Sequence, residues 1–185
     1  MKKILILIFV TIGINSYAKI NIGLHNIELG MSTYMVESIL DKHDISYTWN
    51  TNDKGEEYIK INSAKHNGYR FDGLNIYIKS NKVIRAVFYA ADGGTGPAYT
   101  PGMRQTASNL SRYIENLFLP ISDELINKFG EPITLKNDID NNLDIELAWY
   151  LEDVEILLEC EYNRTNMSGD WIELVGGCWV KYQLK

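Results

Sequence analysis

The sequence Ile-Glu-Leu-Gly-Met-Ser-Thr-Tyr-Met-Val-Glu-Ser-Ile-Leu at residues 27–40 joins a short apolar strand, a glycine turn and the first turns of an amphipathic helix. Ser32 is placed to accept hydrogen bonds from the backbone N–H groups of the first helical turn. The apolar residues between Met35 and Leu40 recur at the spacing of one buried helix face. The segment predicts a strand-to-helix unit, but it contains no group that indicates a reaction.

The N-terminus predicts export. Lys2 and Lys3 precede an apolar run at residues 4–14 that is too short to span a bilayer comfortably, and Ser16-Tyr17-Ala18 offers small residues at a cleavage site. Residues 1–18 are therefore predicted to be a cleaved signal peptide, with a mature protein in the periplasm or outside the cell. A core strand or a membrane anchor is the alternative. No cysteine follows the cleavage site, so no lipid anchor is expected there.

The charge balance argues against several kinds of partner. The chain has a formal net charge of −6 at pH 7, and removal of residues 1–18 takes away two lysines and no acid, which leaves a net charge of −8. Such a balance disfavours binding to nucleic acid and to anionic membranes. The remaining chain, about 167 residues, can form one domain or two small units side by side.

Alternating apolar and polar residues predict strands in the first half of the chain, around residues 45–49, 58–61, 74–79 and 83–89. A three-residue loop, Ser80 to Lys82, would pair Lys79 with Val83 and place Leu74, Ile76 and Ile78 opposite Phe88, Ala86 and Ile84. Residues 91–107 are rich in glycine and proline and are predicted to be a connecting loop. They lack the Lys-Ser/Thr ending of a phosphate-binding loop.

The second half predicts two helices followed by three strands. Ser108 or Ser111 would cap the first helix, which Pro120 would break, and Ser122 would cap the second helix, which Gly130 would end. The strands are expected near residues 144–151, 154–164 and 171–184. The fold class predicted is α+β, with two helix-plus-antiparallel-sheet units in tandem at residues 19–90 and 108–185.

The two cysteines fall on these last strands. A short turn at Glu152-Asp153 and a three-residue loop at residues 168–170 set Cys160 directly opposite Cys178 on the apolar face. In an exported chain this position predicts a structural disulfide, and two buried free thiols are the alternative.

Two short motifs resemble known families. Leu29-Gly30-Met31-Ser32 with the strand hairpin around residues 79–83 resembles the outer-membrane assembly lipoproteins of the BamE/SmpA type, although the lipidated cysteine of that family is missing. The segment from Ser122 to Pro132 looks like a second copy of the helix-to-strand unit. Two such units are similar to the β-lactamase inhibitor protein, and this resemblance implies a concave protein-binding surface. Neither resemblance assigns a functional residue.

The sequence contains no recognisable catalytic motif. His25, His43 and His66 lack the spacing of a metal-binding helix, and no Gly-x-Ser-x-Gly turn is present. We therefore expect no enzyme activity, no cofactor and no metal. A pair of carboxylates of the kind that glycosidases use stays possible, because a sequence does not reveal which carboxylates converge.

The non-core face of the strands combines acidic and aromatic residues. Glu146, Glu155 and Arg85 lie on this face together with the predicted partner-binding residues. These residues are Tyr77, Tyr89, Tyr150, Glu159, Glu161, Trp171, Glu173 and Trp179. Such a surface fits a basic protein partner, although the same acids could simply keep the face soluble.

The sequence thus predicts an exported, non-enzymatic protein-binding module. An inhibitor or immunity-type protein that neutralises a secreted enzyme is one alternative. A cell-envelope hydrolase is an alternative of another class.

Overall fold

A computed structural model of the chain describes residues 20–138 and 143–185. The predicted signal peptide, residues 1–18, lies outside the described residues. The helices and strands are α1 Thr33–Lys42, β1 Tyr47–Thr51, β2 Glu57–Asn62, β3 Lys65–His66, β4 Tyr69–Arg70, β5 Gly73–Lys79, β6 Lys82–Pro97, α2 Pro101–Tyr113, the π-helix η1 Ile114–Phe118, α3 Leu119–Phe129, β7 Ile133–Asp138, β8 Leu143–Tyr150, β9 Val154–Asn166 and β10 Trp171–Leu184.

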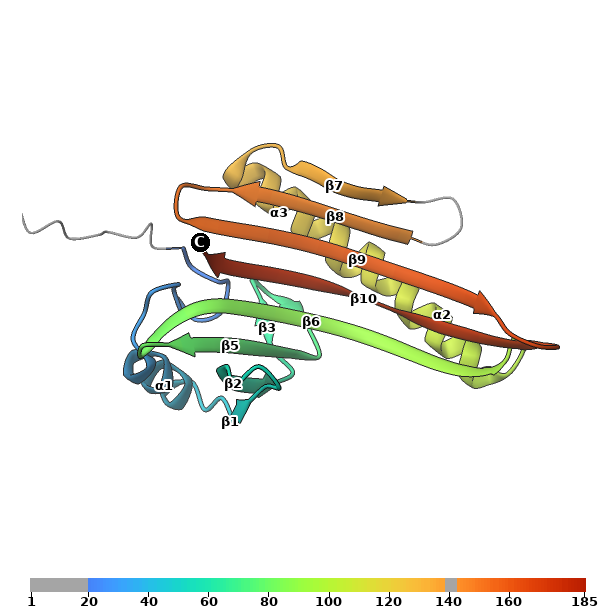
Figure 1. Cartoon of the computed structure of the whole chain (residues 1–185), viewed down its shortest axis with the longest axis horizontal. Helices are drawn as coiled ribbons and strands as arrows, with labels where there is room; N and C mark the ends of the chain where they lie inside the picture. Colours follow the sequence, from blue (N-terminus) through green and yellow to red (C-terminus); the bar gives the residue numbers. More distant parts are fainter. Residues whose placement is uncertain (1–19, 139–142) are drawn as a thin grey trace, which may run out of the picture.

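The α+β class is confirmed, and its main feature is one large antiparallel sheet. Eight strands pair in the order β1-β2-β5-β6-β10-β9-β8-β7, and β3 and β4 form a separate small hairpin. The pairing of β6 with β10 joins the strands of the two halves of the chain into one continuous sheet. Figure 1 shows α2, η1 and α3 as a single long helix behind β8, β9 and β10, with α1 near the turn where β5 ends and β6 begins.

The core lies between the sheet and these helices. Leu74, Phe88, Val180 and Leu158 are cross-strand neighbours in one row of β5, β6, β10 and β9, and each is 0% exposed. The same core contains buried residues from every helical segment except α2: Val36 and Leu40 of α1, Leu117 and Phe118 of η1, and Ile121 and Leu125 of α3. One face of the sheet is therefore covered, and the other face lies away from the helices.

The hairpin of β5 and β6 differs in detail from the prediction. Its loop has two residues, Ser80 and Asn81, with φ of 51° and 60°, so Lys79 pairs with Lys82 and Ile78 pairs with Val83. Two consecutive positive φ angles make a tight hairpin turn, and a bulge next to Tyr77 absorbs the change of register. The predicted pairs Leu74–Phe88 and Ile76–Ala86 are confirmed, while Lys79–Val83 and Ile78–Ile84 are wrong.

The expected loop at residues 91–107 is mostly regular structure. Strand β6 continues to Pro97, and α2 begins at Pro101, with Thr100 as its N-cap. A Cβ atom at Gly96 would lie 3.4 Å from Cγ of Met103, so the missing side chain lets α2 pack directly on the strand. Glycine has a low intrinsic propensity for strands, so these residues were predicted to form a loop. The packing of α2 on β6 outweighs that low propensity.

The two predicted helices of the second half form one helix with a π segment in its middle. Ser108, Ser111 and Ser122 lie inside this helix, so none of them is an N-cap. The N–H of Leu119 donates to the carbonyl of Ile114, five residues back. Pro120 has no N–H to donate to the helix. It directly follows the π segment, in which the α-helical hydrogen bonds to the fourth residue back are already replaced, so the helix continues past it. The predicted end at Gly130 is confirmed.

The C-terminal register is confirmed, but the disulfide is wrong. Cys160 pairs directly with Cys178, and both are free thiols, 1% and 0% exposed. Burial raises the pKa of both thiols, that of Cys160 to about 12. An opposed register brings two Cα atoms close together, but a disulfide also requires side-chain torsions that aim the sulfur atoms at each other. These thiols pack as small apolar side chains in the core.

Candidate functional site

The face of the sheet away from the helices, here called the open face, carries most of the residues predicted to bind a partner. Tyr89, Trp179, Glu159, Glu146 and Lys136 are direct cross-strand neighbours on β6, β10, β9, β8 and β7. We call these five residues the acidic–aromatic row. Adjacent strands lie about 4.8 Å apart, so neighbouring side chains in the row are in contact range.

The two aromatic residues of the row lie over glycines. A Cβ atom at Gly73 would lie 2.9 Å from Cε1 of Tyr89, and a Cβ atom at Gly177 would lie 2.9 Å from Cη2 of Trp179. The rings therefore occupy the space that side chains at these two positions would fill. Both aromatic side chains are part-buried without any helix above them. The sheet thus holds two flat rings in fixed positions before any partner arrives.

Beside the rings, acids face acids across β8 and β9. Glu146 pairs with Glu159, and Asp144 pairs with Glu161, so like charges stand directly opposite each other. Burial raises the pKa of Glu159, and the charges of Glu146, Glu161 and Asp144 raise it further. Like charges that oppose each other across a sheet destabilise it. This cluster of four carboxylates is therefore a place where the fold is electrostatically strained.

One cation of the chain offsets part of this repulsion. Lys136 Nζ lies 3.2 Å from Oδ2 of Asp144, and its pKa is raised first by this hydrogen bond and then by the surrounding acids. Its charge also opposes the upward shift of the pKa of Glu159. The sequence analysis did not name Lys136, because strand β7, which supplies it, was not predicted. It also did not name Asp144, although this residue lies on a predicted strand.

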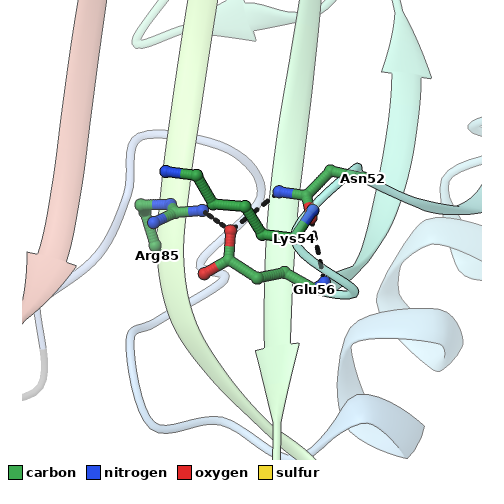
Figure 2. Close-up of polar contacts among 4 residues, drawn as sticks. All are labelled: Asn52, Lys54, Glu56 and Arg85. Atoms are coloured by element: carbon green, nitrogen blue, oxygen red, sulfur yellow. Dashed lines mark hydrogen bonds and ion pairs between the residues drawn. The ribbon is translucent and has the colours of Figure 1, made fainter.

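The opposite end of the open face neutralises its own charges. Arg85 Nη2 donates to Oε2 of Glu56 at 2.8 Å, and the same oxygen accepts from Asn52 Nδ2 at 2.8 Å (Figure 2). These two hydrogen bonds lower the pKa of Glu56. The Arg85 guanidinium also lies 3.8 Å from the centroid of the Tyr77 ring, which packs against Tyr58. Tyr77 is therefore engaged within the protein.

Three other residues that were predicted to bind a partner, Tyr150, Trp171 and Glu173, lie apart from the acidic–aromatic row. Tyr150 is 48% exposed near the C-terminus, where Lys185 Nζ lies 5.7 Å from its ring centroid. Trp171, 50% exposed, and Glu173 lie near the turn between β9 and β10, at the end where the long strands extend beyond the rest of the sheet (Figure 1). The structure brings together Tyr89, Trp179, Glu159 and Glu161, and places these others toward the ends of the strands.

The histidines do not form a metal site in the described part of the chain. His66 is fully buried, and its Nε2 lies 2.6 Å from the hydroxyl of Tyr182. The rings of His25 and His43 stack with centroids 4.0 Å apart. Within residues 20–138 and 143–185, no group of three or more His, Cys, Asp and Glu side chains is arranged to hold a metal ion.

Comparisons of the chain with protein families, with curated proteins and with solved structures give no match. Among the described residues, no helix has both the length and the apolar character needed to cross a membrane. The resemblance to the lipoproteins and to the β-lactamase inhibitor protein stays a prediction from short motifs.

Proposed function

We propose that this protein is an exported binding protein without enzymatic activity, whose partner is a basic protein that docks on the open face. The observation that carries the proposal is the opposition of Glu146 to Glu159 and of Asp144 to Glu161. A lysine or arginine of a partner placed among these acids would relieve their repulsion, so binding would gain free energy that the free protein lacks.

The aromatic end of the row supports the same proposal. Interfaces between proteins commonly combine a central aromatic contact with polar groups around it. Tyr89 and Trp179 already pack over Gly73 and Gly177, so little side-chain entropy would be lost when a partner covers them. The acids next to them would then select a partner of opposite charge.

Export and the two-unit organisation belong to the same proposal. Residues 1–18 have the composition of a signal peptide. The strands from residues before 98 form one half of the sheet, and those from residues after 132 form the other half, each half with its own helix. We infer that two helix-plus-sheet units, one ending with β6 and the other beginning with α2, are joined side by side through β6 and β10.

Affinity capture tests the proposal. The full mature chain would be immobilised and exposed to envelope extract and to secreted proteins, in parallel with the variants Trp179→Ala and Glu159→Gln. Truncation of a central interface aromatic typically costs about 2 kcal/mol or more, roughly thirtyfold in affinity. We expect a captured basic protein to be lost with both variants and to be released by added salt.

The matched control is Trp49→Ala. Trp49 is 44% exposed on β1, and its Nε1 donates to Glu37 of α1, on the helix side of the sheet. Capture that survives Trp179→Ala, or that is lost equally with Trp49→Ala, would contradict docking on the open face. A resident envelope protein as partner would favour a module of the envelope, and a secreted enzyme that loses activity would favour an inhibitor.

A hydrolase is the second candidate, because one observation favours it. The raised pKa of Glu159 opposite Glu146 is the pattern of a general acid beside a second carboxylate, and the Trp179 ring next to them would suit a sugar. Turnover of cell-wall glycan by the wild type, abolished in Glu159→Gln, would support this candidate over the binding protein.

A further inference from the structure

A groove lies on the helix side of the sheet, where the two halves of the chain meet. The small hairpin of β3 and β4 packs against η1, and the groove of about 500 Å³ runs between them. Its size is in the range of small-molecule sites, which often form at junctions of this kind. Eight residues line it: Gly68, Tyr69, Arg70, Asn109, Arg112, Tyr113, Asn116 and Leu117.

The charge of this groove is opposite to that of the protein. Arg70 and Arg112 both line it, although the chain has a net charge of −6. Among residues 20–138 and 143–185, neither guanidinium forms an ion pair with a carboxylate. Arg112 donates one hydrogen bond, from Nη2 to Oδ1 of Asn109 at 2.9 Å. The carboxylates of Asp92 and Asp72 do not line the groove, and they accept hydrogen bonds from Asn109 and Tyr113. The two arginines in its lining therefore indicate a site for an anion.

The helix presents a polar face to the groove. Asn109, Arg112, Tyr113 and Asn116 recur at the spacing of one helix face. Asn109 is held in place, because its Nδ2 donates to Oδ2 of Asp92 at 2.7 Å while its Oδ1 accepts from Arg112. Side-chain amides both donate and accept hydrogen bonds, so Asn116 suits ligand hydroxyl groups, which do the same.

The π segment lies at this groove. Tyr113 precedes η1, and Asn116 and Leu117 lie inside it. A π segment is rare within an α-helix and is frequent at functional sites. Burial raises the pKa of Tyr113 to about 12, with the nearby carboxylates of Asp72 and Asp92 adding to the effect. Its protonated hydroxyl donates to Oδ2 of Asp72 at 3.5 Å, so Tyr113 offers the groove its ring and not its hydroxyl.

We propose that this groove binds an acidic sugar. Arg70 and Arg112 bind its carboxylate, Asn116 bonds to its hydroxyl groups, and the rings of Tyr69 and Tyr113 with Leu117 contact its apolar surface. A guanidinium matches a carboxylate in shape as well as in charge, which gives the site its preference for a planar acid group. The groove is on the helix side, so this proposal is independent of docking on the open face.

Isothermal titration calorimetry of the full mature chain tests the proposal, with D-glucuronate as probe and D-glucose and inorganic phosphate as comparisons. We expect glucuronate to bind at least tenfold more tightly than either comparison. The variants Arg70→Gln and Arg112→Gln each lower its affinity by at least tenfold. Both side chains are exposed, so thermal unfolding of the variants should match the wild type.

The matched control is Arg104→Gln. Arg104 is exposed on the same helix but donates to the carbonyl of Tyr99, away from the groove. The control variant should bind glucuronate like the wild type. An absence of glucuronate binding, equal losses in all three variants, or phosphate binding as tight as that of glucuronate would each overturn the proposal.

Discussion

Glu159 is a residue at which stability and binding are expected to oppose each other. Its pKa is raised because it is part-buried and faces Glu146, so its charged form costs stability at neutral pH. We expect Glu159→Gln to raise the free energy of unfolding by about 0.5–1 kcal/mol, as removal of a like-charge pair in a sheet does. Urea denaturation at pH 7 measures the change.

The same variant should bind the basic partner more weakly, since it removes a charge that the partner meets. Glu152→Gln is the control, because Glu152 is an exposed acid in the turn between β8 and β9. Its effect on unfolding should be within about 0.5 kcal/mol. Loss of stability in Glu159→Gln would mean that the acids do not repel each other in the folded protein.

His66 gives the fold a defined sensitivity to acid. Burial lowers its pKa to about 4, with Lys128 adding to the effect, while an unfolded histidine titrates near 6.5. The unfolded state therefore binds a proton first as the pH falls. The stability that neutral His66 contributes is complete above about pH 6.5 and is lost progressively down to about pH 4, by at most about 3 kcal/mol.

The variant His66→Gln tests this assignment. Gln retains a group that can bond to the Tyr182 hydroxyl, but it does not titrate. We expect the free energy of unfolding of the variant to be lower at pH 7.5 and to fall less between pH 6.5 and pH 4 than that of the wild type. An equal fall in both proteins would assign the acid sensitivity to other groups.

Among the elements, the packing of α2 on β6 depends most on glycine. Gly96 faces Met103, and a Cβ there would be 3.4 Å from Met103 Cγ, so a methyl group fits and a larger side chain does not. We expect Gly96→Val to destabilise the protein by about 1–3 kcal/mol, as overpacking does, and Gly96→Ala to cost less. Thr95→Val, on the other face of β6, should be nearly neutral; thermal unfolding compares the three.

The elements that were predicted correctly are those in which local pattern and core packing agree. Alternation in the last strands predicts the register that pairs Cys160 with Cys178, and this pairing is observed. The end of β6 was missed because Gly93, Gly94 and Gly96 form a strand only when β10 and α2 pack against them. The continuous long helix was missed because Pro120 predicts a break unless a π segment precedes it.

The candidate site was also predictable only in part, because some of its residues are brought together by strand pairing and not by local sequence pattern. Strand alternation places Trp179, Glu159 and Glu146 on the same face, and the register makes them neighbours. Gly177 lies on the same strand and face as Trp179, so alternation places it. Gly73 beneath Tyr89 and Lys136 beside Glu146 lie on neighbouring strands, so alternation within one strand does not reveal them. The groove with Arg70 and Arg112 joins residues from the two halves of the chain, and no local pattern reports such a junction.

At the scale of the whole molecule, the sheet divides the protein into two sides with different properties. The helix side holds the core and the arginine-lined groove, and the open side holds four acids beside two fixed aromatic rings. The end of the open face near Arg85 is neutralised within the protein, so a basic partner should meet the acidic–aromatic row and not the Tyr77 end.

Carboxyl footprinting of the complex is the most direct test of whether a basic partner docks on the acidic–aromatic row. The mature protein, free and bound to its captured partner, would be labelled with glycine ethyl ester and a water-soluble carbodiimide, and the labelled sites read by mass spectrometry. We predict that the partner reduces labelling of Glu146, Glu159 and Glu161, while the labelling of Glu152 is unchanged. Unchanged labelling of these three acids in a saturated complex would contradict docking on the open face.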